Sequence, residues 1–172
     1  ILLSFVTIIA VSTMVIPFHL SALAYEAEVH KIAFMDSKWD GKSIPDGQIC
    51  TAQGGENPHT PKLKITNLPS GTNYLLMIIT DEDAGENGQH GIFRLEVPSG
   101  ATEVIFPPIH ETAKAMPPGV TLEKREGWVM SRGGHYLPPC SNRRNHNYYS
   151  DITAFGEGDK KITNNYIDWG KY

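Results

Sequence analysis

The chain has 172 residues, only two cysteines and a formal net charge of −4 at pH 7. Acidic and basic side chains are mixed along it, so the charge pattern does not point to nucleic-acid binding. Once an apolar amino-terminal segment is set apart, the remaining residues suffice for one domain and no second domain is needed.

The amino-terminal segment is apolar, and the first charged side chain is Glu26. The small-residue motif Ala22-Leu23-Ala24 lies just before it. We interpret residues 1–24 as a signal peptide, although no basic start precedes the apolar run, and expect the folded domain to span residues 25–172. The alternative is an uncleaved membrane anchor, because a bilayer span needs roughly 20 apolar residues. Cleavage would give a secreted or periplasmic protein with no stable membrane span.

The two cysteines, Cys50 and Cys140, are far apart in the sequence. A secreted protein meets an oxidising environment, where two cysteines allow at most one internal disulfide. We therefore treat Cys50 and Cys140 as a candidate disulfide. Two separate buried thiols are the alternative.

Alternating apolar and polar residues predict mostly strands, taken in chain order. Residues 62–65 and 93–97 alternate and predict half-buried strands, whereas the continuous apolar run over 74–80 predicts a central strand. Residues 109–116 predict the one helix, ended by Pro117. Residues 146–155 predict a further strand, on which His146 and Tyr148 share one face.

Two polar clusters follow or begin these strands. The first is Asp81-Glu82-Asp83 with His90, and the second is Pro138-Pro139-Cys140 with His146-Asn147-Tyr148. Carboxylates, imidazoles and a phenol can hold a charged group or transfer protons. Taken singly, each residue has an ordinary structural explanation as a polar turn or a hydrogen-bonded strand residue. Their combination predicts a small polar pocket.

Several motifs, in order, resemble the phosphatidylethanolamine-binding protein family, in particular its bacterial Raf kinase inhibitor-like branch. They are Asn57-Pro58-His59-Thr60-Pro61-Lys62-Leu63, Asn67-Leu68-Pro69-Ser70-Gly71-Thr72, Asp81-Glu82-Asp83-Ala84, Tyr136-Leu137-Pro138-Pro139-Cys140 and His146-Asn147-Tyr148. Each motif is weak by itself, but together they cover most of the chain after residue 24.

The chain also departs from the family pattern. The two prolines of the family's Asp-Pro-Asp-x-Pro loop are absent after Asp81, and Gly91 replaces a tryptophan. The strand after His90 is one residue longer than expected, which predicts a bulge or a shift of phase. Little sequence follows Phe155, so the family's late helices look deleted, and residues 167–172 resemble its closing strand.

The resemblance implies a mainly β fold, a sandwich with few short helices, and a shallow site that binds a phosphorylated or other anionic small ligand such as a phospholipid head group. The residues that match the family's site are Asp81, Asp83, His90, Pro139, His146 and Tyr148. Neither catalysis nor a cofactor or metal is expected. If the histidines hold the anion, binding should strengthen as pH falls through about 6.5, the ordinary histidine pKa.

Two other functions remain open. Two histidines and two aspartates could bind a divalent metal and make a hydrolase. However, His110-Glu111-Thr112-Ala113-Lys114 lacks the second histidine of a zinc-protease helix. The chain could instead be a protein-interaction or inhibitor module, a role that some relatives have and that does not need the pocket histidines.

Overall fold

The computed structural model describes residues 29–112, 115–124 and 135–172, so the predicted signal peptide lies outside the described residues. The described part of the chain contains eight strands and three short 3-10 helices. The strands are β1 (Lys31–Phe34), β2 (Leu63–Thr66), β3 (Tyr74–Asp81), β4 (Gln89–Glu96), β5 (Glu103–Phe106), β6 (Val120–Lys124), β7 (Asn147–Phe155) and β8 (Lys161–Lys171). The 3-10 helices are η1 (Thr51–Gln53), η2 (Glu82–Asn87) and η3 (Glu157–Asp159).

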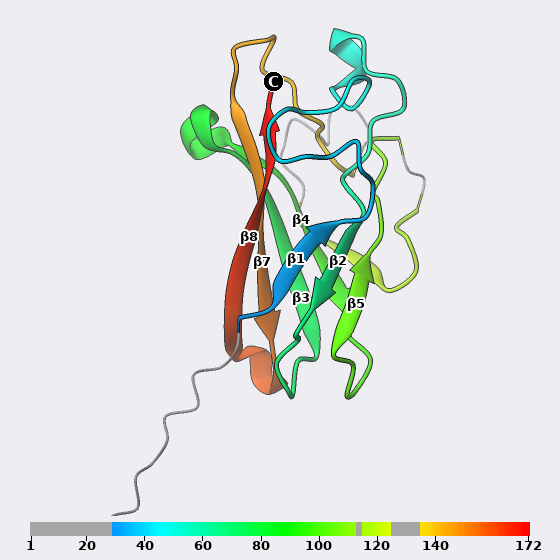
Figure 1. Cartoon of the computed structure of the whole chain (residues 1–172), viewed down its shortest axis with the longest axis vertical. Helices are drawn as coiled ribbons and strands as arrows, with labels where there is room; N and C mark the ends of the chain where they lie inside the picture. Colours follow the sequence, from blue (N-terminus) through cyan, green and yellow to red (C-terminus); the bar gives the residue numbers. More distant parts are fainter. Residues whose placement is uncertain (1–28, 113–114, 125–134) are drawn as a thin grey trace, which may run out of the picture.

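The strands form two antiparallel sheets that pack as a sandwich (Figure 1). The smaller sheet has the order β1-β2-β5, and the larger has the order β6-β4-β3-β7-β8. Figure 1 shows the smaller sheet in front of the larger one. The predicted mainly β sandwich is therefore confirmed, and the run over 74–80 forms the central strand β3.

The core lies between the sheets because alternate side chains of each strand point inward. Met77 of β3 and Phe93 of β4 are fully buried, as are Leu63 and Ile65 of β2, whereas Lys64 faces outward. Trp169 of β8 is also fully buried, and its ring meets that of Trp39 edge-on at 5.5 Å. The alternation seen in the sequence thus gives the correct inner and outer faces.

The connection between β7 and β8 is a short turn that contains only η3. No α-helix lies between these two strands, which agrees with the expected loss of the family's late helices. Among the residues described, no helix is both long and apolar enough to cross a bilayer.

The helix predicted over residues 109–116 is wrong in its described part. His110 instead forms an isolated antiparallel bridge with His59, and a turn follows. Ile109 N donates to Thr60 Oγ1 at 3.0 Å, and Ile109 O accepts from Thr60 N at 3.0 Å. Because this pairing uses the backbone groups that begin a helix, tertiary contacts override the local pattern.

Candidate functional site

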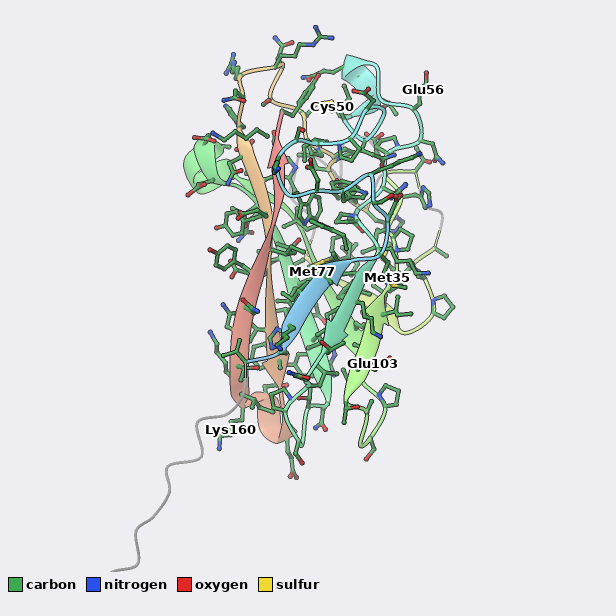
Figure 2. The ribbon with its side chains drawn as sticks, in the orientation of Figure 1. Met35, Cys50, Glu56, Met77, Glu103 and Lys160 are labelled. Atoms are coloured by element: carbon green, nitrogen blue, oxygen red, sulfur yellow. A yellow bond between two sulfur atoms is a disulfide. The ribbon has the colours of Figure 1, made fainter. Side chains whose placement is uncertain are left out.

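The candidate site is built at one end of the sandwich, where β3 ends and β7 begins. Asp81 pairs with Tyr148 in the register of these two strands. Residues that are far apart in the sequence therefore meet at one edge of the sheet. The opposite end of the sandwich carries the turn near Lys160, whereas Cys50 lies close to the site end (Figure 2).

A β-bulge places His90. In the pairing of β3 with β4, Ile79 lies opposite Gly91 and Thr80 lies opposite Gln89, so His90 is the extra residue. A bulge turns a side chain that regular alternation would aim elsewhere, and His90 and Gly91 are both buried. Gly91 has a φ of 139°, a conformation that L side chains rarely adopt. The sequence predicted a bulge or a shift of phase in the strand after His90, whereas the bulge lies at His90 itself and the pairing with β3 is regular from Gly91 onward.

Asp81 is a buried carboxylate, with 4 % of its surface exposed. Its side chain accepts from Asp83 N at 3.0 Å and thereby caps η2. Asp83 turns away to accept from Asn147 N at 2.8 Å through Oδ2. Asp83 therefore joins η2 to the start of β7, which is a supporting position.

Asp81 and His146 form the central contact. His146 Nδ1 lies 2.8 Å from Oδ2 and 3.0 Å from Oδ1 of Asp81. A carboxylate accepts hydrogen bonds when ionised, so Nδ1 is the donor and Nε2 is left as the ring atom available to a ligand. The His146 side chain is 18 % exposed, whereas that of Asp81 is 5 % exposed. The pair therefore presents an imidazole at the surface with its carboxylate behind it.

Tyr148 lies beneath this pair and is fully buried. Burial raises the pKa of its phenol well above the ordinary value, and the negative charge of Asp81 adds to the shift. Tyr148 therefore keeps its proton at physiological pH. Its hydroxyl oxygen also accepts from Cys140 N at 3.3 Å.

His90 meets Tyr148 edge-on, with ring centroids 5.3 Å apart. His90 Nδ1 donates to Leu137 O at 2.7 Å, because a carbonyl oxygen can only accept. In its neutral form the ring therefore carries its proton on Nδ1. This bond also ties the bulge to the segment that precedes Pro139.

The segment around Pro139 is held by a disulfide between Cys50 and Cys140, which confirms that predicted pair. The Cα atoms are 5.3 Å apart, within the usual range. Buried Pro139 accepts from Cys50 N at 2.9 Å through its carbonyl. Gln53 adds a clamp, since Nε2 donates to Cys140 O and Oε1 accepts from Asn142 N, each at 3.0 Å.

Tyr172 is a contributor that sequence reasoning missed. Its carbonyl accepts from His146 N at 2.9 Å and from Ser141 Oγ at 2.5 Å, and its own N–H donates to His146 O at 3.0 Å. These are backbone contacts, so no side-chain motif could have indicated them. They fix the backbone of His146 and hence the direction of its ring.

The structure thus brings Asp81, His90, His146 and Tyr148 together, with Asp83 and Pro139 in the surrounding frame. The partly exposed imidazole of His146 and the protonated phenol of Tyr148 are hydrogen-bond donors of the kind that bind anions. In the described ranges, no group of three or more His, Cys, Asp and Glu side chains is placed to hold a metal ion.

Comparison with known proteins identifies the family. The family model described as phosphatidylethanolamine-binding protein matches residues 36–166. Among solved structures, Escherichia coli YbcL, described as a member of the mammalian PEBP family, aligns with a TM-score of 0.57 and 16 % identity, over 83 % of this chain and 97 % of that one. The Chlamydia trachomatis protein CT736, described as a homologue of the same proteins, aligns with a TM-score of 0.50 and 17 % identity, over 84 % and 97 %. No curated protein sequence matches.

Proposed function

Because the chain belongs to the phosphatidylethanolamine-binding protein family, we propose that it binds a phosphorylated or other anionic small ligand, of the phospholipid head-group type, without catalysing a reaction. The site consists of Asp81, His90, His146 and Tyr148, and the segment around Pro139 supports it. The observation that carries the proposal is the contact between Asp81 and His146, at 2.8 Å and 3.0 Å.

This contact suits anion binding for a geometric reason. A carboxylate on Nδ1 fixes the tautomer that bears the proton on Nδ1 and leaves Nε2 directed away from Asp81. When Nε2 also carries a proton, it offers an N–H donor to a phosphate oxygen. The Asp81 side chain is only 5 % exposed, so it lies behind the ring and does not contact the ligand directly.

The expected affinity for an isolated head group is weak. A few charge-assisted hydrogen bonds contribute about 1.5 to 3 kcal/mol each, and association removes much of that gain. The resulting dissociation constant is roughly millimolar. A lipid with its acyl chains would bind more tightly only through contacts outside the site described above.

The test is an NMR amide-shift titration of the purified protein with phosphoethanolamine. We expect shifts around Asp81, His90 and His146 that disappear in His146→Ala. The matched control is Glu157→Gln, which removes an exposed carboxylate in the turn at the other end of the sandwich and should bind like the wild type. A folded wild-type protein with no shifts at this site would refute the proposal.

A second variant separates charge from structure. Asp81→Asn keeps the shape of the side chain but removes the charged acceptor that holds His146 Nδ1, so we expect about 10-fold weaker binding. Unchanged affinity in a folded Asp81→Asn protein would contradict the role given to the pair. Metal analysis of the purified protein tests the hydrolase alternative, which requires a bound divalent ion.

A further inference from the structure

A second hollow lies on the outer face of the larger sheet, away from the site just described. It measures about 350 Å³, within the range of small ligand pockets. Its lining residues come from η2, β7 and β8 and are acidic, aromatic or amide-bearing: Glu82, Asn147, Tyr149, Asp151, Tyr166 and Asp168. We name this hollow the tyrosine groove.

The strand register explains how the tyrosine groove is built. Tyr149 lies opposite Asp168, and Asp151 lies opposite Tyr166, so each ring has a carboxylate as its cross-strand neighbour. The two rings meet edge-on, with centroids 6.4 Å apart. Tyr149 follows buried Tyr148 on β7, so its side chain points to the opposite face of the sheet. The groove is therefore separate from the anion site.

The carboxylates of the tyrosine groove form no ion pair with a cation of the described residues, although Lys171 lies opposite Asn147 in the strand register. Glu82 accepts from Asn147 Nδ2 at 3.1 Å, and Asp151 accepts from Asn164 Nδ2 at 3.2 Å, so both partners are neutral amides. No lysine or arginine in the described part of the chain forms an ion pair with Glu82, Asp151 or Asp168. The groove thus joins three carboxylates to two aromatic rings, a set that can bind a positive charge.

The same face of the sheet contains an occupied version of this arrangement. The Arg94 guanidinium lies 3.7 Å from the centroid of the Tyr74 ring, and its Nε donates to Glu96 Oε1 at 2.6 Å. A guanidinium combines a flat surface that stacks on an aromatic ring with N–H groups that bind carboxylates. Tyr149 and Tyr166, with Asp151 and Asp168, offer the same two contacts, and no arginine of the described residues stacks on either ring.

We propose that the tyrosine groove binds an arginine side chain of a protein partner. Tyr166 is 60 % exposed, so its ring is open to a partner, and it lies opposite the carboxylate of Asp151. A lysine ammonium carries the same charge but cannot stack as a plane, so it fits this site less well. The proposal does not rest on the anion site, because the two lie on opposite faces of β7.

The test compares two peptides by NMR titration of the full protein: acetyl-Gly-Arg-Gly-Arg-Gly-amide, and the same peptide with citrulline in place of arginine. Citrulline keeps the planar shape but has no charge. We expect amide shifts around Tyr149, Tyr166 and Asp168 with the arginine peptide and at least 5-fold weaker binding with citrulline. A lysine version of the peptide should bind about 3-fold more weakly than the arginine peptide.

Variants of the protein locate the binding. Tyr166→Ser and Asp168→Asn change exposed side chains, and each should weaken the arginine peptide about 3- to 5-fold. Glu157→Gln again serves as the control, because it removes the same charge outside the groove, and His146→Ala should leave peptide binding unchanged. Equal binding of the arginine and citrulline peptides, equal binding of the lysine peptide, or shifts confined to another face would each overturn the proposal.

Discussion

Removal of the disulfide provides a quantitative test of what holds the site end of the sandwich together. Cys50 and Cys140 are 90 residues apart in the sequence. In the loop-closure model, a cross-link of this length reduces the entropy of the unfolded chain and stabilises the folded state by about 4.6 kcal/mol at 25 °C. The double variant Cys50→Ala, Cys140→Ala should therefore lose most of this amount. Alanine is preferable to serine here because Cys50 is fully buried, and a buried hydroxyl would add a cost of its own.

Urea unfolding measures the loss directly. With a slope of about 2 kcal/mol per molar urea, the midpoint should fall by about 2 M, and wild-type protein unfolded under reducing conditions should show a similar fall. The folded variant should retain the site, because Cys50 N still donates to Pro139 O and Gln53 still holds residues 140 and 142. A loss of less than about 1 kcal/mol at an unchanged slope would refute the loop-closure reasoning.

Two further predictions concern stability. Gly170 has a φ of 108°, and a Cβ there would lie 2.3 Å from Ser43 N, so Gly170→Ala should cost about 3 kcal/mol or more. Gly158 has a φ of 62°, and a Cβ there would have no atom within 4 Å, so Gly158→Ala should lower the free energy of unfolding by only about 1 kcal/mol. Equal losses of melting temperature in the two variants would contradict this steric explanation. Burial lowers the pKa of His30, so the unfolded state binds more protons than the folded state once the pH falls through about 6.5. Stability should therefore decrease from pH 7.5 to 5.5, and His30→Gln should reduce this slope in urea unfolding. Burial also lowers the pKa of His110, so a part of the slope should remain. An unchanged slope would show that His30 is not responsible.

The strands could be predicted from the sequence because burial imposes a period of two on a strand with one inner face. The apolar run of β3 has no such alternation, yet its length and flanking turns still identified a central strand. The helix over residues 109–116 failed because Thr60, far away in the sequence, supplies the hydrogen bonds that Ile109 makes. A local pattern contains no information about such a partner.

The residues of the candidate site could be named from the sequence, but their arrangement in space could not. The sequence indicated which side chains form the candidate site, and family resemblance linked two clusters that periodicity alone could not join. The contact between Asp81 and His146 spans 65 residues and depends on the register of β3 against β7. Tyr172 acts through its backbone, so its identity gives no signal. The tyrosine groove arises from cross-strand pairs in β7 and β8, which the sequence does not align until the register is known.

The bonds between His146 and Tyr172 also have a consequence for the order of folding. The imidazole of His146 is fixed only after the last residues of β8 have paired with the start of β7. Strand β7 must in turn have paired with β3. Contacts between such distant segments form slowly, because the intervening chain must lose its freedom before they can stabilise it. We therefore expect the site to mature late during refolding, after the hairpin of β3 and β4. A head-group ligand should then slow unfolding without accelerating the early steps of folding.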